Sequence, residues 1–312
     1  MRTLFFVILL SVTFVSAHAQ TLRVTPASYV HDGKNSTGPT TRTIESVMPY
    51  AIESFYHADW RQTQKLLNEL KQIDSENPVP YFLSSMIPFW EYFFGGTEPQ
   101  KAEEFLKLSS IAIELGEKQL KAAPQDTASI LMLSGLHGYR SLVAAQEKKY
   151  RIAMSSGITG YSYTKTLMSL DNDDPNTLMG QGVFHYMVGS IPSEIRWMAR
   201  LAGLSGDRNE GLHLLEQAAS SDSHVSNDAR MFLVYLYERE GEFSKAIHHL
   251  NSLISKYPGN PIFHYNLARI HELNGANDLA ISSYNAVIKS TLPDLRQLRV
   301  LSNERIAVLS GK

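Results

Sequence analysis

Apolar residues recur at spacings of three and four along the chain from Ile44 onward, with polar residues filling the positions between them. This is the period of amphipathic α-helices, in which one face is buried and the other is solvated. Prolines and glycines fall at intervals suited to helix ends, and no segment shows a convincing run of the two-residue alternation typical of a strand. The pattern therefore predicts an all-α fold made of successive amphipathic helices.

Two segments near the C-terminus repeat one another at an offset of 34 residues, which is the period of the tetratricopeptide repeat. The matched positions are Leu233 with Leu267, Glu238 with Glu272, Gly241 with Gly275, Ala246 with Ala280, Leu250 with Tyr284 and Leu253 with Val287. Small residues such as Ala246 and Ala280 allow the second helix of each pair to approach the first closely. Gly241 and Gly275 suit the left-handed position that ends a helix, and Pro258 stops the second helix of its pair.

Weaker copies of the same junction surround Pro78, Pro124 and Pro175 further upstream. Together these junctions indicate six or seven helix pairs, with a closing helix over residues 295–309. Because stacked pairs bury one continuous core, each pair depends on its neighbours. We predict a superhelix (solenoid) of stacked antiparallel helix pairs that resembles tetratricopeptide-repeat proteins.

The N-terminus has the features of a signal peptide: Arg2, then an apolar run over residues 4–15, then Ala17 and Ala19 at the positions that a signal peptidase reads. The run would reach about 18 Å as a helix, against about 30 Å for a bilayer core. We predict cleavage before Gln20, and no later stretch is long enough to form an integral membrane segment. The predicted organisation is a signal peptide at 1–19, an extended or mobile arm at 20–41, a degenerate tetratricopeptide-like helical region at 42–222, and C-terminal tetratricopeptide repeats with a capping helix at 223–312.

The chain has no cysteine, which excludes disulfides, thiolate catalysis, cysteine-based zinc sites and a lipoprotein anchor. Exported eukaryotic domains usually contain disulfides, so this composition favours a bacterial periplasmic or secreted protein. Removing Arg2 from the 29 basic residues leaves 28, against 31 acidic residues. This near-balance gives no electrostatic reason to expect nucleic acid or an anionic membrane as a partner.

The run GLSGDRNEG, residues 203–211, invites comparison with phosphate-binding and nucleophile loops. It has neither the glycine spacing and lysine of a P-loop nor the G-x-S-x-G of a nucleophile elbow. It does fit a bend between two helices, with Gly203 and Leu204 ending one helix and Asp207 capping the next, with Glu210 three residues on. The helix before the bend would have Ser190 as its cap and Pro192 in its first turn. The helix after the bend would carry Gly211, Leu215 and Ala218 on its packing face.

The segment from Gly180 to Ala219 resembles a signature of the tetratricopeptide repeat protein 39 family, which includes the yeast inclusion-body-clearance protein. The matching residues are Ser190, Pro192, Arg196, Gly203, Ser205, Gly206, Asp207, Arg208, Gly211 and Leu212, with Leu204 where the family has phenylalanine. The resemblance implies an all-helical repeat fold and a role through partners, linked to lipid homeostasis and inclusion clearance, without known catalysis. Members of that family are intracellular, whereas the N-terminus of this chain predicts export.

No metal and no cofactor are expected. An EF-hand loop beginning at Asp171 would need a glycine at Asn176 and a glutamate at Gly182, and Pro175 interrupts it, so we expect a helix N-cap before Pro175 instead. His264 and His271 could share a helix face near Glu272, but a solvated repeat face is the simpler interpretation.

Aromatic residues cluster over residues 81–96 and again near 161–163 and 184–186. One interpretation of this cluster is that large side chains fill the gaps between stacked helices. An apolar pocket with a few polar tips explains it in another, because small-ligand sites are built in this manner. The residues that would form such a pocket are Trp90, Glu91, His185, Tyr186 and Trp197. His137 and His185 are otherwise interpreted as core histidines.

Tetratricopeptide grooves bind their partners on the inner face of each first helix. The 34-residue register predicts that Met231, Tyr235, Glu238, Tyr265, Arg269 and Glu272 line this face. An aromatic and charged surface suits an extended peptide or a helix. The sequence therefore predicts an exported, non-enzymatic scaffold with a protein or peptide partner and no catalytic residues. The alternative is a helical protein that uses the aromatic centre to bind an apolar small ligand or lipid. An enzyme with its site at the same centre is a weaker alternative.

Overall fold

The computed structural model describes residues 42–96, 98–169, 174–191, 193, 196–197 and 205–311. Within these residues the secondary structure is entirely helical, which confirms the predicted all-α class. The helices are α1 (Ile44–Tyr56), α2 (Trp60–Ile73), α3 (Pro78–Phe93), α4 (Pro99–Ala122), α5 (Thr127–Gln146), α6 (Tyr150–Met168), α7 (Pro175–Gly189), α9 (Arg208–Ala219), α10 (Val225–Glu240), α11 (Phe243–Lys256), α12 (Pro261–Leu273), α13 (Asn277–Lys289), the 3-10 helix η1 (Pro293–Leu295) and α14 (Arg296–Leu309).

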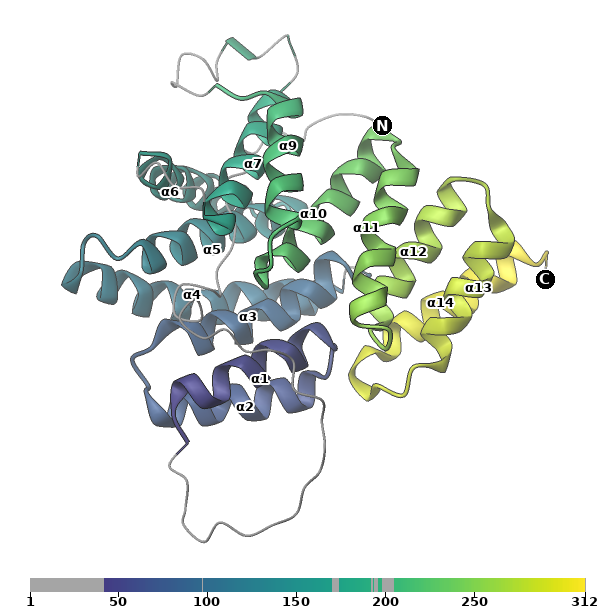
Figure 1. Cartoon of the computed structure of the whole chain (residues 1–312), viewed down its shortest axis with the longest axis horizontal. Coiled ribbons are helices and arrows are strands. Elements are labelled where there is room, and N and C mark those ends of the chain that lie inside the picture. The colour runs from purple at the N-terminus through teal and green to yellow at the C-terminus, as the bar shows by residue number, and fades with distance from the viewer. Residues whose placement is uncertain are drawn as a thin grey trace, which may run out of the picture.

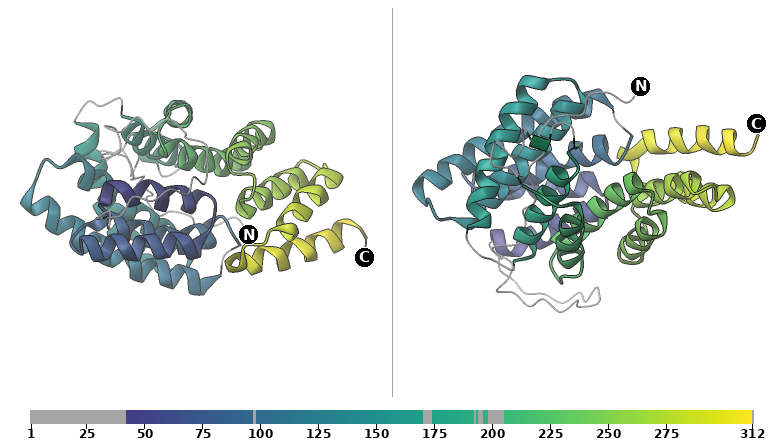
Figure 2. Two further views of the ribbon diagram at one scale, coloured as in Figure 1. Left: turned by 60° about the horizontal axis from the view of Figure 1, so that its bottom comes forward. Right: turned by 90° about the horizontal axis from the view of Figure 1, so that it is seen from above.

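Consecutive helices pack as pairs, and the pairs follow one another through the molecule (Figure 1). The pairs are α1 with α2, α3 with α4, α5 with α6, α7 with α9, α10 with α11, and α12 with α13, and α14 packs on α13 at the C-terminal end. This arrangement confirms the predicted tetratricopeptide-like solenoid. Figure 2 shows that the C-terminal helices extend from a wider body formed by the earlier pairs.

Helix ends fall where the local sequence predicts them. Asn260 caps α12 by accepting a hydrogen bond from the backbone N–H of Ile262, and Pro261 occupies the first turn, where no N–H is needed. Gly241 ends α10 with φ of 74°, and Gly275 follows α12 with φ of 75°. Both glycines therefore hold the left-handed conformation that favours glycine, as the repeat register predicts.

Some predictions concern residues outside the described ranges. These are the signal peptide at 1–19, the arm at 20–41, Pro192, and Gly203 and Leu204 at the start of the glycine-rich run. Ser190 lies within the described part. It ends α7, and its hydroxyl donates to the backbone oxygen of Tyr186 at 2.7 Å.

The two ends of the solenoid meet through one hydrophobic core. Trp90 of α3 is 1% exposed, and its ring lies 5.3 Å from that of Phe55 on α1 and 6.0 Å from that of Phe263 on α12. Polar bonds cross the same boundary, since the side-chain amide of Asn260 donates to the backbone oxygen of Tyr56 at 2.8 Å. We call this contact the N–C seam; it consists of Tyr56, Trp90 and Phe94 against Asp228, Asn260, Phe263 and Asn266.

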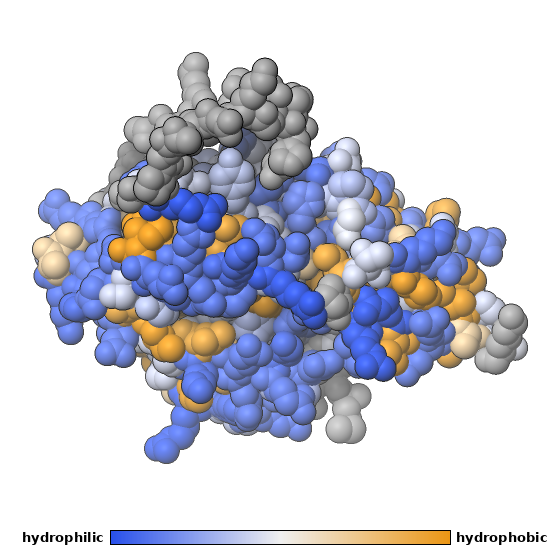
Figure 3. Space-filling view, turned by 90° about the horizontal axis from the view of Figure 1, so that it is seen from below, coloured by the Kyte–Doolittle hydropathy of each residue, from blue (hydrophilic) through white to orange (hydrophobic). Residues whose placement is uncertain are grey.

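The N–C seam decides which surface of the last repeats stays accessible, because α1 and α3 pack against α10 and α12. Viewed from below, the protein surface is mostly polar, with hydrophobic side chains in small separated patches (Figure 3). No helix in the described residues combines the length and apolar character needed to cross a bilayer.

Candidate interaction surface

The six residues predicted to face a partner lie on α10 and α12, but two of them are covered. Met231 is 0% exposed and Tyr265 is 9% exposed. The ring of Tyr235 lies 5.1 Å from that of Phe93, so α3 shields part of this face. Tyr265, which was predicted to line the partner-binding face, is therefore mostly covered, because the 34-residue register gives the face of the helix and not what packs on it.

The charged members of the set bind one another. Arg269 Nη2 donates to Glu238 Oε1 at 2.7 Å, which links α12 to α10. Arg305 on α14 donates through two nitrogens to the carboxylate of Glu272, and Tyr284 donates to the same group at 3.0 Å. Burial disfavours the charged form of Glu272, yet the hydrogen bonds from Arg305 and Tyr284 outweigh it and hold its pKa below the ordinary value.

These pairs form a row along the C-terminal ends of α10 and α12. We call it the Glu–Arg strip, made of Glu238, Arg269, Glu272 and Arg305. The arginine side chains remain 39% and 41% exposed, so each keeps part of its guanidinium in contact with solvent. A guanidinium has five N–H donors, and only some of them are used here. The strip thus stabilises the stacking of repeats and still offers donors to a partner.

The glycine-rich run acts as a close junction between α7 and α9 rather than a ligand loop. A Cβ atom on Gly206 would lie 2.7 Å from the backbone oxygen of His185, and one on Gly211 would lie 2.6 Å from the backbone oxygen of Gly182. Helices that approach this closely leave no room for a side chain at either glycine. For the described residues of this run, the prediction that Asp207 caps the following helix is confirmed. The helix predicted to end at Gly203 and Leu204 lies outside the described residues.

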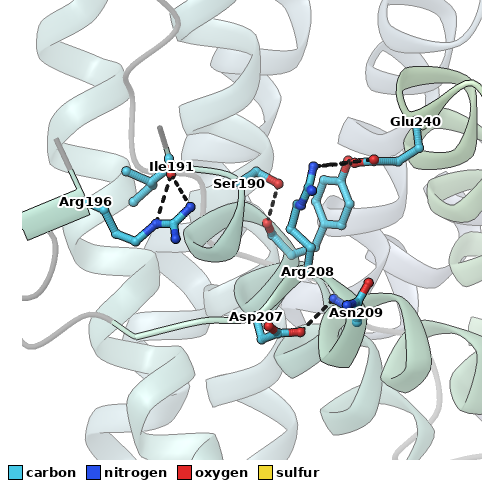
Figure 4. Close-up of polar contacts among 8 residues, drawn as sticks. Ser190, Ile191, Arg196, Asp207, Arg208, Asn209 and Glu240 are labelled. Carbon is cyan, nitrogen blue, oxygen red and sulfur yellow. Dashed lines mark hydrogen bonds and ion pairs between the residues drawn. The ribbon is translucent and has the colours of Figure 1, made fainter. Parts of the chain in front are cut away.

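Polar groups of the same run fix the start of α9 (Figure 4). The carboxylate of Asp207 accepts hydrogen bonds from the backbone N–H groups of Asn209 at 2.8 Å and Glu210 at 3.0 Å, as predicted for an N-cap. Arg208 donates to Glu240 at 3.2 Å, and the Tyr186 hydroxyl donates to the same carboxylate at 2.6 Å. Burial, together with this carboxylate, raises the pKa of Tyr186 to about 12. These contacts tie α7, α9 and α10 together.

The five residues proposed for an apolar pocket are not assembled into one. Trp90 lies in the packed N–C seam, whereas Trp197 is 58% exposed. Tyr186 is committed to Glu240, and His185 lies beside it on α7. No contact among the described residues joins Trp90 to His185. The aromatic centre is a filled core, because its rings pack at 4.4 to 6.3 Å from one another.

Glu91 faces an open groove that the sequence patterns did not reveal. The groove has a volume of about 940 Å³ and lies between α2, α3 and η1, which carries Asp294. Lys101 Nζ lies 2.7 Å from Glu91 Oε2. Burial raises the pKa of Glu91, and Lys101 opposes that rise. The signal available in the sequence was a single carboxylate within a strongly apolar helix, which identifies an unusual residue but not the shape around it.

The histidine pair considered for metal binding is used differently. His264 bonds through Nε2 to the backbone oxygen of Pro258 at 2.8 Å, and burial lowers the pKa of His271. Among the described residues, no three histidine or carboxylate side chains converge closely enough to hold a metal ion. Asp174 caps α7 immediately before Pro175 by accepting from the N–H of Asn176 at 2.9 Å, as the sequence predicted.

Comparison with known proteins places these features in a family. The family model described as Iml2/Tetratricopeptide repeat protein 39 matches residues 174–310, which extend from the cap of α7 to the end of α14. No curated protein matches the chain as a relative. The matched stretch contains the glycine junction, the Glu–Arg strip and the two 34-residue repeats. The chain therefore has a tetratricopeptide-repeat-like fold, and its residues 174–310 are similar to the Iml2/Tetratricopeptide repeat protein 39 family.

Proposed function

We propose that this protein is an exported, non-enzymatic scaffold that binds a protein partner along the Glu–Arg strip. The observation that carries the proposal is the pair of arginines, Arg269 and Arg305, which are fixed by glutamates and remain about 40% exposed. A fixed guanidinium loses little conformational entropy when it binds, and arginines are frequent energetic anchors of interfaces. The repeat fold supports a role in protein interaction, since stacked repeats supply extended binding surfaces.

Export is part of the proposal and rests on the N-terminal sequence. Cleavage near Ala19 would release a mature chain that begins close to Gln20 in the bacterial periplasm or medium. The mature protein purified from that compartment is the correct bait. Its N-terminal sequence gives a direct test, because a chain that retains Met1 would contradict export.

The test of the strip is affinity capture from periplasmic extract with quantitative mass spectrometry. We expect a specific protein partner to be recovered with wild type and to fall at least ten-fold with an Arg269→Ala, Arg305→Ala double variant, because each anchor typically contributes about 2 kcal/mol. The matched control is Lys118→Ala with Arg296→Ala, which removes two exposed cations outside the strip. Equal recovery with both double variants would contradict the strip as the binding face.

The alternative, an apolar ligand site at the aromatic centre, lacks a supporting observation because Trp90 is 1% exposed and its neighbours fill the space. A lipid or metabolite that co-purifies with the protein and is lost in Trp90→Ala would favour that alternative instead.

A further inference from the structure

Helix α6 exposes a row of large hydrophobic side chains. Tyr150, Met154 and Ile158 are 53%, 63% and 59% exposed, and their spacing of four residues aligns them in one row. Elsewhere in the described residues, exposed large apolar side chains occur only one or two to a helix. Single exposed hydrophobics are normal on a protein surface, whereas a continuous row marks a contact with another molecule.

The inner face of α6 explains why these side chains point outward. Apart from Leu167 near its C-terminal end, the buried residues of α6 are small or hydroxyl-bearing, namely Ala153, Ser156, Gly157, Gly160 and Thr164. They let α6 approach α5 closely, and Thr164 Oγ1 lies 2.7 Å from Ser134 Oγ. In its first three turns α6 therefore buries mainly small residues and exposes Tyr150, Met154 and Ile158, whereas an ordinary surface helix buries its larger apolar residues.

The charged side chains of α6 itself are all cations. No aspartate or glutamate occurs between Lys148 and Ser169, while this stretch carries four cations. Lys149 pairs with Glu103 at 3.2 Å. The other three are Lys148, Arg151 and Lys165; all are exposed, and none forms an ion pair with a described residue.

A further carboxylate acts on α6 from another side. Glu117 of α4 contributes to the raised pKa of Tyr163, after burial as the main cause. Tyr163 is nine residues from Met154, which corresponds to half a turn around the helix. The exposed row is thus flanked by Arg151 and Lys165, which form no ion pair with a described residue, while Glu103 near its N-terminal end pairs with Lys149. In Figure 1, α6 lies toward the outer edge of the molecule, and it packs against α5 and α7.

We propose that the outer face of α6 binds an acidic amphipathic helix of a partner protein, which would lay its apolar side on Tyr150, Met154 and Ile158 and its carboxylates against Arg151 and Lys165. The inference rests on the proposed scaffold role and adds a second binding face. A helix matches the row because apolar residues repeated at every fourth position form a ridge that packs into the groove of another helix. Methionine also adapts its shape to the partner more readily than other core residues.

The test uses two labelled 18-residue peptides with the same leucine row, one with glutamates and one with lysines at the remaining positions. Binding is measured by fluorescence anisotropy on the full mature chain. We expect the glutamate peptide to bind at least ten-fold tighter than the lysine peptide. A Met154→Glu, Ile158→Glu variant should lose at least ten-fold in affinity for it, and an Arg151→Glu, Lys165→Glu variant should reverse the preference.

The control variant is Val308→Glu, which places one charge on an equally exposed apolar residue of α14 and should bind the glutamate peptide like wild type. All substituted side chains are exposed, so circular dichroism should show unchanged folding. Equal affinity for the two peptides, or unchanged affinity in the Met154→Glu, Ile158→Glu variant, would overturn the inference. Binding to vesicles with 30% anionic lipid in place of the glutamate peptide would also overturn it.

This experiment is independent of the Glu–Arg strip. The Arg269→Ala, Arg305→Ala variant should bind the glutamate peptide normally, so failure at α6 and failure of the strip give different patterns.

Discussion

At the scale of single residues, Asp228 has the most unusual environment. Its carboxylate accepts a hydrogen bond from the Tyr56 hydroxyl at 2.6 Å within the N–C seam. Burial raises the pKa of Asp228 to about 7, although the bond from Tyr56 opposes the rise. The other polar or titratable groups around it are Glu53, His224, Asn227 and Tyr257.

This environment predicts that the stability of the fold decreases as pH rises. The unfolded chain releases the Asp228 proton near pH 3.9, whereas the folded chain holds it until about pH 7. The contribution of Asp228 to the unfolding free energy is therefore fully present below about pH 4. It falls by roughly 1.4 kcal/mol per pH unit as pH rises from 4 toward 7. Asp228→Asn should remove this loss, which urea unfolding between pH 4.5 and pH 8 would measure.

The control is Asp222→Asn, since Asp222 is exposed. If Asp228→Asn and Asp222→Asn show the same dependence of unfolding free energy on pH, then Asp228 does not carry the effect.

At the scale of elements, the pairing of α7 with α9 depends on glycine. Gly211 faces the backbone of α7 so closely that a methyl group would collide with Tyr186 N and lie 2.6 Å from Gly182 O. We expect Gly211→Ala to lower the unfolding free energy by about 1 to 3 kcal/mol, because the helices must separate to relieve the overlap. Gly259→Ala is the control, since nothing lies within 4 Å of a Cβ atom there. Chemical denaturation of both variants measures the difference, and equal stabilities would refute the close-packing explanation.

Other features of single elements were predictable from the sequence alone. The caps at Asp207 and Asn260 and the left-handed glycines at Gly241 and Gly275 follow from rules that involve only a few neighbouring residues. The outward row on α6 was not predicted, because a row of apolar residues with helical spacing normally indicates the buried face. Only the packing of small residues against α5 shows that the row points outward.

At the scale of the whole molecule, the N–C seam joins the first helices to the last repeats. Such a contact makes the solenoid depart from a simple row of nearest-neighbour units. We expect Phe263→Ala, which removes a ring that is 0% exposed in the seam, to cost about 3 to 5 kcal/mol and to raise hydrogen exchange in both α3 and α12.

Tyr284→Ala provides the comparison, because Tyr284 is also buried but belongs to the α12–α13 pair away from the seam. Its substitution should raise hydrogen exchange in α12 and α13 while α3 stays protected. If Phe263→Ala leaves α3 equally protected, the seam does not couple the two ends.

The sequence by itself determined the helical class, the 34-residue repeat, the helix ends and the structural nature of the glycine-rich run. All of these arise from residues close together in the chain, or from a period that repeats along it. The tertiary structure decided which faces are covered. Tertiary packing buries Met231 and Tyr265, which the register had assigned to a binding groove. The ring of Tyr265 packs on that of Tyr284 of α13, and the N–C seam fills the space around Trp90. The reason is physical: periodicity defines the faces of a helix, but the segment that packs on each face is set by contacts between residues such as Asn260 and Tyr56, which are 204 positions apart.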